Sequence, residues 1–166
     1  MTGKVVQPGD GKTYLVLGDL FTILATGEET GGAYGLVETL MRPQGFIPPH
    51  IHDDMDEVHY ILDGEVEYQI DERTVLATPG TFIHIFRGQC HSFKNVGLKP
   101  AKSISWVTPA GGEQFFAEAG QLVQPKNEDE KLSLLGKVDP DELEKAIALA
   151  ATKYKLRFVV PTTNAG

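Results

Sequence analysis

Short runs of alternating apolar and polar residues, separated by turn residues, fill the first two thirds of the chain. The clearest run is 65–70, where Val66, Tyr68 and Ile70 alternate with polar neighbours and are predicted to face inward. Similar runs predict further strands over residues 14–17, 20–25, 33–41, 45–52, 74–77, 81–86, 91–96 and 101–108. Strands spaced roughly every eight to twelve residues, with turn signals between them, predict an antiparallel sandwich or barrel.

The pattern changes after Trp106. Residues 113–119 predict one or two helical turns, and the charged stretch 124–131 predicts a solvated linker. A longer helix is predicted to begin at Asp139, because this cap residue is followed by Pro140 and by acidic residues in the first turn. Its apolar stripe is expected to pack against the barrel or a partner subunit, with a lid over the site as the alternative; the stripe consists of Leu143, Ala146, Ile147, Ala150 and Tyr154.

We therefore expect three segments. Residues 1–13 form an N-terminal arm, residues 14–108 form the barrel, and residues 109–166 form an extension with helices that pack on the barrel and a short final strand over 158–160. The length of 166 residues suits one domain. This organisation is mainly β, with helices confined to the C-terminal part.

The composition and charge of the chain limit the classes of molecule that it is expected to bind. A net charge of −8 argues against a nucleic-acid partner, which would need a basic patch. A single cysteine excludes an internal disulfide. No apolar run has the length of a membrane span, and the N-terminus lacks a secretory signal, so we expect a cytoplasmic location without a membrane partner. A homodimer is the default expectation for the oligomeric state.

Three histidines and one glutamate form the most informative chemical pattern. His50 and His52 are two residues apart, which places both imidazoles on one face of a strand. Glu57 follows five residues later, and His91 lies downstream. Imidazole and carboxylate ligands suit Fe, Ni, Co, Mn, Cu or Zn. The alternative is a chance scatter of five histidines, which the spacing of the whole pattern disfavours.

This pattern resembles the two motifs of the cupin superfamily. The first motif is carried by Gly45, His50, His52, Glu57 and Gly64, and the second by Gly80, Gly88, His91 and Asn95. Gly45 stands one residue closer to His50 than in the usual motif, and Phe86 replaces the usual proline. The resemblance, with its short gap 65–79 between motifs, is to microbial single-domain cupins. It implies an antiparallel jelly-roll β-barrel (a double-stranded β-helix) holding one divalent transition metal ion through His50, His52, Glu57 and His91.

Several neighbours are candidates for contact with the metal or a substrate. His59 lies two residues beyond Glu57, so it faces the same interior and is either a core histidine or a partner of the metal ligands. Candidate pocket residues, each also readable as plain core, are Phe46, Ile61, Phe93 and Trp106. Glu57 is either the fourth ligand alone or also a catalytic base, a role that the resemblance to cupin dioxygenases implies.

Three functions fit these residues. Residues 109–120 (PAGGEQFFAEAG) resemble a stretch of flavonol (quercetin-type) 2,3-dioxygenases, which implies a dioxygenase that uses dioxygen on a hydroxylated aromatic small molecule. The second hypothesis is another metal-dependent cupin enzyme, such as an isomerase or decarboxylase, because one fold carries many chemistries. The third is a non-catalytic cupin that binds a small ligand. The metal and the substrate are not predicted.

Overall fold

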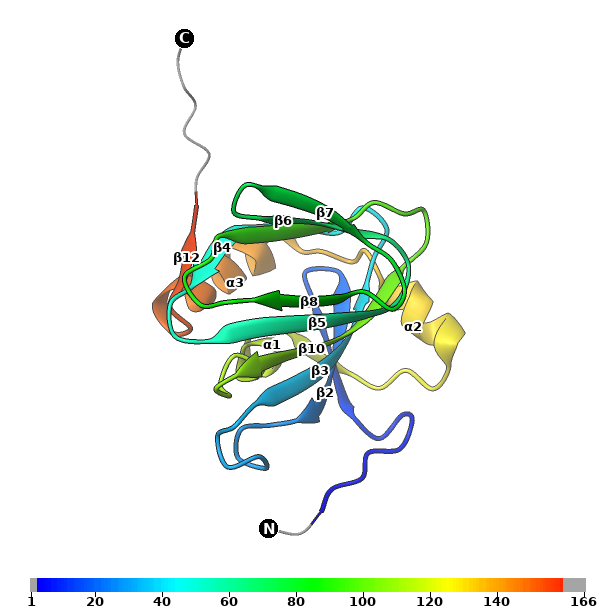
Figure 1. Cartoon of the computed structure of the whole chain (residues 1–166). Coiled ribbons are helices and arrows are strands. Elements are labelled where there is room, and N and C mark those ends of the chain that lie inside the picture. The colour runs from blue at the N-terminus through cyan, green and yellow to red at the C-terminus, as the bar shows by residue number, and fades with distance from the viewer. Residues whose placement is uncertain (1–2, 160–166) are drawn as a thin grey trace.

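Two antiparallel β-sheets packed face to face make up most of the protein in the computed structural model, which describes residues 3–159 (Figure 1). The larger sheet has the strand order β11 (Gln121–Val123), β1 (Lys12–Val16), β2 (Asp19–Ala25), β3 (Gly35–Met41), β10 (Ala101–Thr108), β5 (Asp56–Asp63) and β8 (Phe82–Ile85). The smaller sheet has the order β12 (Leu156–Phe158), β4 (Phe46–His52), β9 (His91–Asn95), β6 (Val66–Ile70) and β7 (Arg73–Ala77). The predicted mainly β jelly-roll fold is confirmed.

The core lies between the two sheets, where the inward side chains of facing strands meet. Val66 and Tyr68 of β6 are 4% and 1% exposed, and Ile70 packs against the same cluster, as the alternation predicted. Ile61 of β5 and Ile85 of β8 belong to this cluster from the larger sheet. Burial of these apolar faces on both sheets supplies the main stabilisation of the fold.

The strand that carries His50 and His52 is irregular. β4 contains Pro48 and Pro49, which have no N–H to donate to a neighbouring strand. The register between β4 and β9 accordingly shifts between Ile47 and His50, which marks a bulge or similar irregularity. Beyond it, His50 lies directly opposite His91 of β9, so the pairing of these two strands brings two of the histidines together.

Three helices follow the barrel strands: α1 (Gln114–Ala119), α2 (Glu128–Leu134) and α3 (Pro140–Thr152). In Figure 1, α1 and α3 lie near each other, and α2 lies away from them on the other side of the molecule. α3 begins where the sequence predicted, and the Asp139 side chain accepts a hydrogen bond from the Asp141 N–H. Its apolar stripe is only half covered, because Ala146 and Ala150 are buried whereas Leu143 and Ile147 are exposed.

The structure corrects several predicted boundaries. α2 begins inside the stretch predicted as a charged linker and takes up its second half, and β11 was not predicted. β1 begins at Lys12, inside the predicted arm. The last described strand is Leu156–Phe158 rather than 158–160, and Val160 lies outside the described residues. Within residues 3–159, no helix is long and apolar enough to cross a membrane.

Candidate metal centre

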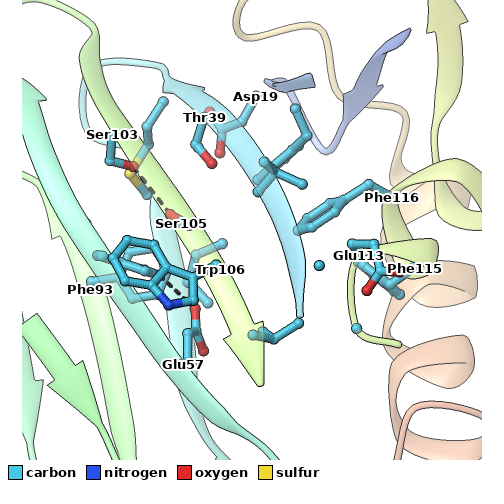
Figure 2. A pocket seen from close by; sticks show the side chains of 18 of the residues that line it. Asp19, Thr39, Glu57, Phe93, Ser103, Ser105, Trp106, Glu113, Phe115 and Phe116 are labelled. Atoms are coloured by element: carbon cyan, nitrogen blue, oxygen red, sulfur yellow. Dashed lines mark hydrogen bonds and ion pairs between the residues drawn. The ribbon is translucent and has the colours of Figure 1, made fainter. Parts of the chain in front are cut away.

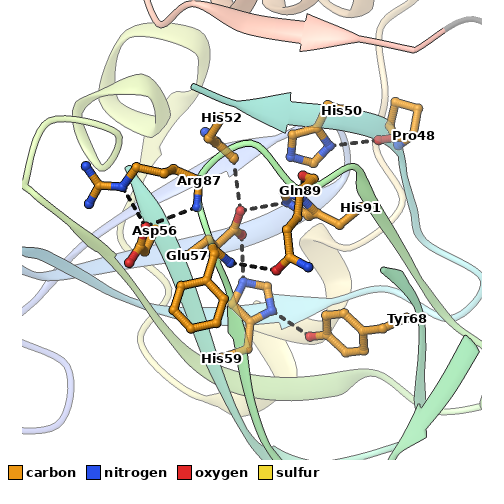
Figure 3. A network of polar contacts seen from close by, with 11 residues as sticks. Pro48, His50, His52, Asp56, Glu57, His59, Tyr68, Arg87, Gln89 and His91 are labelled. Atoms are coloured by element: carbon orange, nitrogen blue, oxygen red, sulfur yellow. Dashed lines mark hydrogen bonds and ion pairs between the residues drawn. The ribbon is translucent and has the colours of Figure 1, made fainter. Parts of the chain in front are cut away.

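Four side chains from three strands meet at one point between the sheets (Figure 3). His50 and His52 come from the end of β4, Glu57 from the start of β5 and His91 from the start of β9. One potential ligand atom from each lies within 4.8 Å of the others. Oε2 of Glu57 is 3.0 Å from Nε2 of His52 and 3.0 Å from Nε2 of His91. The fold thus gathers the four predicted ligands into a cluster that can hold a metal ion.

Backbone carbonyls fix which ring nitrogen faces the cluster. Nδ1 of His50 is 2.8 Å from the Pro48 carbonyl oxygen, and Nδ1 of His91 is 3.2 Å from that of Gln89. A carbonyl only accepts, so each Nδ1 carries a proton and each neutral ring keeps its lone pair on Nε2. For His91 this lone pair points at an oxygen of Glu57. Two acceptors so close need a cation between them, which is a proton shared as an N–H···O hydrogen bond in the metal-free protein and can be a divalent metal in its place.

His52 has no such outer partner. Its Nδ1 is buried and lacks a hydrogen-bond partner among the described residues. A buried ring nitrogen without a partner is costly, and most buried polar groups are paired. The orientation of His52 is therefore governed by its contact with Glu57 at the centre, which again suits a site organised around an ion.

The protonation states of the clustered side chains suit the coordination of a metal ion. Burial and the neighbouring His91 lower the pKa of His50 to about 4, so its imidazole is neutral and able to coordinate at neutral pH. Burial alone would raise the pKa of Glu57, but hydrogen bonds from His52, His59 and His91 hold it well below its usual value. Glu57 is therefore an ionised ligand. For His91, contact with this carboxylate outweighs burial and raises the pKa.

Glu57 is also held from the side opposite the histidine ligands. Nε2 of His59 is 2.7 Å from Oε1 of Glu57, and Nδ1 of His59 is 2.6 Å from the hydroxyl of Tyr68. Because the carboxylate only accepts, the Nε2–H of His59 donates to it, and the Tyr68 hydroxyl donates to Nδ1. This chain fixes Oε1 and leaves Oε2 directed at the other ligands, as outer partners of metal ligands commonly do.

Tyr68 is well suited to anchor this chain. It is 1% exposed, and burial together with the charge of Glu57 raises the pKa of its hydroxyl. The phenol therefore stays protonated and remains a donor. The sequence indicated that Tyr68 faces inward but gave no sign that it contacts His59, because an inward tyrosine on a strand looks the same as an ordinary core residue.

The cluster opens onto a cavity of about 170 Å³ between the sheets. Most of the cavity wall is apolar, and aromatic rings from several elements contribute to it (Figure 2). Among the residues that the sequence nominated, His59, Phe93 and Trp106 line the cavity. Ile61 lies in the core cluster instead. Phe46 does not line the cavity, because its side chain is 51% exposed.

Trp106 borders the cavity but points away from it. Ser105, the preceding residue of β10, is buried, and alternation along the strand sends the next side chain to the other face of the sheet. There the indole lies 6.3 Å from the ring of Phe82, whose side chain is 57% exposed. Trp106 is therefore at the edge of the cavity, as predicted for a pocket residue, but the strand register turns its indole away from the metal ligands.

The C-terminal extension closes one wall of the cavity, a contribution that the sequence did not predict in detail. Phe116 of α1 stacks on Phe21 of β2 with ring centroids 4.1 Å apart. Phe115 and Tyr154 meet edge to face at 5.5 Å, and both line the cavity. α3 itself contributes no lining residue, so the part of the extension that faces the cavity is α1 together with the segment after α3.

Comparison with known proteins agrees with this architecture. Residues 37–108 match the family model described as the cupin domain. Over 90 residues the chain is 29% identical to quercetin 2,3-dioxygenase of Bacillus subtilis (strain 168), covering 54% of this chain and 27% of that protein. Over 96 residues it is 34% identical to polyketide synthase CurC of Streptomyces cyaneus, covering 55% of this chain and 60% of that protein. The chain thus spans only part of either relative.

Solved structures share the fold. A predicted oxalate decarboxylase from Thermotoga maritima superposes with a TM-score of 0.59 at 18% identity, covering 64% of this chain and 99% of the other. KdgF from Halomonas sp. superposes with a TM-score of 0.53 at 16% identity, covering 58% of this chain and 85% of the other. At these identities the likeness concerns the fold alone.

Proposed function

Because residues 37–108 are a cupin domain, we propose that the protein is a metal-dependent dioxygenase acting on a hydroxylated aromatic small molecule. The observation that carries the proposal is the convergence of three imidazoles and one carboxylate at an apolar, aromatic-lined cavity. The similarity to a quercetin 2,3-dioxygenase over 54% of this chain supports the choice of reaction. Dioxygen is the second substrate in this proposal.

The metal would be held by His50, His52, Glu57 and His91, the four side chains whose ligand atoms lie together. Fe, Ni, Co, Mn, Cu and Zn all accept imidazole and carboxylate ligands, so the donor set is compatible with each. When bound, such an ion supplies Lewis-acid chemistry and open positions for a substrate oxygen and dioxygen.

Glu57 is the proposed catalytic base. It is the only acid in the cluster, and a base must reach the substrate hydroxyl directly or through one water. Its lowered pKa keeps it ionised before the proton arrives. His59 holds Oε1, so Oε2 is the oxygen that takes the proton, while the apolar walls around Phe93 exclude water.

The same cluster would serve an isomerase, a decarboxylase or a non-catalytic ligand-binding protein, and one experiment separates these functions. The protein is loaded in turn with Fe, Ni, Co and Mn and offered a panel of phenols, including a flavonol, in an oxygen electrode. We expect oxygen consumption that depends on both metal and phenol. Turnover without oxygen use would favour another metal enzyme, and ligand binding without turnover would favour a binding protein. Homodimer formation and a cytoplasmic location stay predictions.

The role of Glu57 is tested by Glu57→Gln, which keeps the size and one oxygen but removes the charge. We expect this variant to retain some metal and to bind substrate, while turnover falls by about 10² to 10⁴, the usual contribution of general base catalysis. His59→Phe should be milder, because His59 positions Glu57 without being a ligand. Near-normal turnover of Glu57→Gln with metal bound would mean that another group is the base.

A further inference from the structure

A row of three hydroxyl groups interrupts the apolar wall of the cavity. Ser103 and Ser105 lie two residues apart on β10, and Thr39 of β3 pairs directly with Ser103. Alternation along the strands turns all three to the same face of the sheet, and all three line the cavity. Figure 2 shows them on these two neighbouring strands. The row is a polar strip in surroundings that are otherwise mainly hydrocarbon.

These hydroxyls have hydrogen-bonding capacity to spare. The oxygens of Ser103 and Ser105 are 3.4 Å apart, which is long for a hydrogen bond between hydroxyls. The Thr39 hydroxyl has no hydrogen-bond partner within residues 3–159. The nearby carboxylate of Asp19 is partly engaged, because its Oδ1 accepts a hydrogen bond from the Arg42 N–H at 2.8 Å and lies 3.0 Å from the Arg42 guanidinium. Each hydroxyl can donate once and accept twice, so the strip can satisfy a polar group of a ligand.

The strand register gives the distance between this strip and the metal ligands. On β10, Val107 lies opposite Glu57, Ser105 opposite His59 and Ser103 opposite Ile61. At about 3.3 Å per residue, the two serines stand roughly 7 and 13 Å along the strand from the level of Glu57. A ligand that reaches both the cluster and the strip must span such a distance with an apolar body between its two polar ends.

The cavity volume limits the size of the apolar part of such a ligand. A volume of about 170 Å³ is close to the roughly 150 Å³ of an apolar protein cavity that holds benzene. One aromatic ring or a compact pair of rings therefore fits within this volume, whereas a three-ring flavonol would extend through the open side of the cavity or require the wall formed by α1 to move. The strip carries no charge, so a neutral polar group is favoured over a carboxylate, whose burial would need a partner of opposite charge.

We propose that Thr39, Ser103 and Ser105 form a polar subsite that binds the far end of a one-ring or compact two-ring phenol. The first hydroxyl of this ligand faces Glu57, and a second neutral group, such as a hydroxyl, meets the subsite. The position of the first hydroxyl rests on the proposed function. The subsite itself rests on three cavity hydroxyls with hydrogen-bonding capacity to spare, and it selects substrates by the presence of the second polar group.

The test compares matched ligands by calorimetry, without oxygen, on protein loaded with Zn²⁺. The pairs are phenol against hydroquinone, and 2-naphthol against 2,6-dihydroxynaphthalene. We expect the dihydroxy member of at least one pair to bind about five- to tenfold more tightly, the gain typical of a new hydrogen bond. Equal affinity within both pairs, or no saturable binding of any of the four probes, would overturn the proposal.

Substitutions of the three hydroxyl residues test whether they cause the preference for the dihydroxy probe. The triple variant Thr39→Val, Ser103→Ala, Ser105→Ala should lose the preference for the dihydroxy probe while keeping its affinity for the monohydroxy probe, which also reports an intact cavity. Ser92→Ala removes a buried hydroxyl of β9 that does not line the cavity and should keep the preference. A preference that survives in the triple variant would refute the subsite. The single variants Ser105→Ala and Thr39→Val, each expected to weaken the preference, decide the matter if the triple variant does not fold.

These outcomes are separate from those of the oxygen-uptake experiment. A preference that depends on the three hydroxyls, in a protein that consumes no oxygen, would support the subsite and contradict the dioxygenase. Oxygen uptake in a protein that binds both members of each pair equally would support the dioxygenase and contradict the subsite.

Discussion

Glu57 divides its two carboxylate oxygens between two tasks. Oε1 accepts the hydrogen bond of His59, which Tyr68 holds in turn, and Oε2 faces His52 and His91. An outer hydrogen bond of this kind reduces the freedom of a ligand and fixes the direction of its lone pairs. The orientation of Glu57 is therefore fixed before a metal binds. The same oxygen, Oε2, is the one proposed to accept a proton from a substrate.

His50 gives a prediction for the pH dependence of stability in the metal-free protein. Its pKa of about 4 in the folded state lies below the usual value of 6.5, so the unfolded chain binds the proton first. Folding stability should therefore be full above pH 6.5 and fall as the pH drops toward 4, by about 1.4 kcal/mol per pH unit for one proton. The pKa of His91 is raised instead, so its contribution to folding stability is full below pH 6.5 and is lost as the pH rises above that value.

The measurement is urea unfolding of wild type and His50→Gln at pH 6.5, 5.5 and 4.5. The difference in slope between the two proteins isolates His50, since the other groups are common to both. His84→Gln is the control, because it removes an imidazole from the exposed face of β8 and leaves His50 and its surroundings unchanged. Parallel stability curves for wild type and His50→Gln would contradict the assigned role of burial at His50.

At the scale of elements, the C-terminal extension completes the cavity. Phe116 of α1 stacks on Phe21 of β2, and Tyr154 lies between α3 and β12, where it meets Phe115. β12 then pairs with β4, the strand that carries His50 and His52. The extension therefore contacts both the apolar wall of the cavity and the strand that presents two of the ligands.

Phe116→Ala tests this contribution. Loss of the stacked ring should lower the free energy of unfolding by about 2 kcal/mol, less than for a fully buried phenylalanine because Phe116 is only partly buried. The wider cavity should also bind a flavonol better relative to phenol. Phe82→Ala on the exposed face of β8 should change neither property appreciably. Urea unfolding and calorimetry measure the two effects, and unchanged stability with unchanged selectivity would show that α1 does not form the wall.

The elements also show what a sequence can reveal. Strict alternation was enough to identify β6, and spacing together with the resemblance to the two cupin motifs was enough to nominate the four clustered ligands. α2 was missed because Glu128–Leu134 reads as a solvated charged run, although the Asn127 cap before three acids was an available signal. β11 has three residues and pairs with a strand far away in the chain, so no local pattern identifies it. Side-chain partners such as Tyr68 and His59 depend on the register between strands, which a single sequence does not give.

At the scale of the whole molecule, the two sheets form the cavity beside the ligand cluster, and its wall has three kinds of surface. The cluster of potential metal ligands lies at one part of it, aromatic and aliphatic side chains form most of it, and the hydroxyls of β3 and β10 form a polar strip. Residues from β2 through β12 contribute to this space, so the site exists only when the fold is complete. Such a cavity suits a ligand with polar ends and an apolar body.

The most direct test of this account is the metal content of the protein after loading and removal of free ions. The account predicts close to one divalent ion per chain in wild type and in His84→Ala, whose imidazole lies outside the cluster beside Asp56. Occupancy should fall sharply in His50→Ala and His91→Ala, because each loses a ligand to the ion. Full occupancy in both of these variants, or no bound metal in wild type, would contradict the central claim.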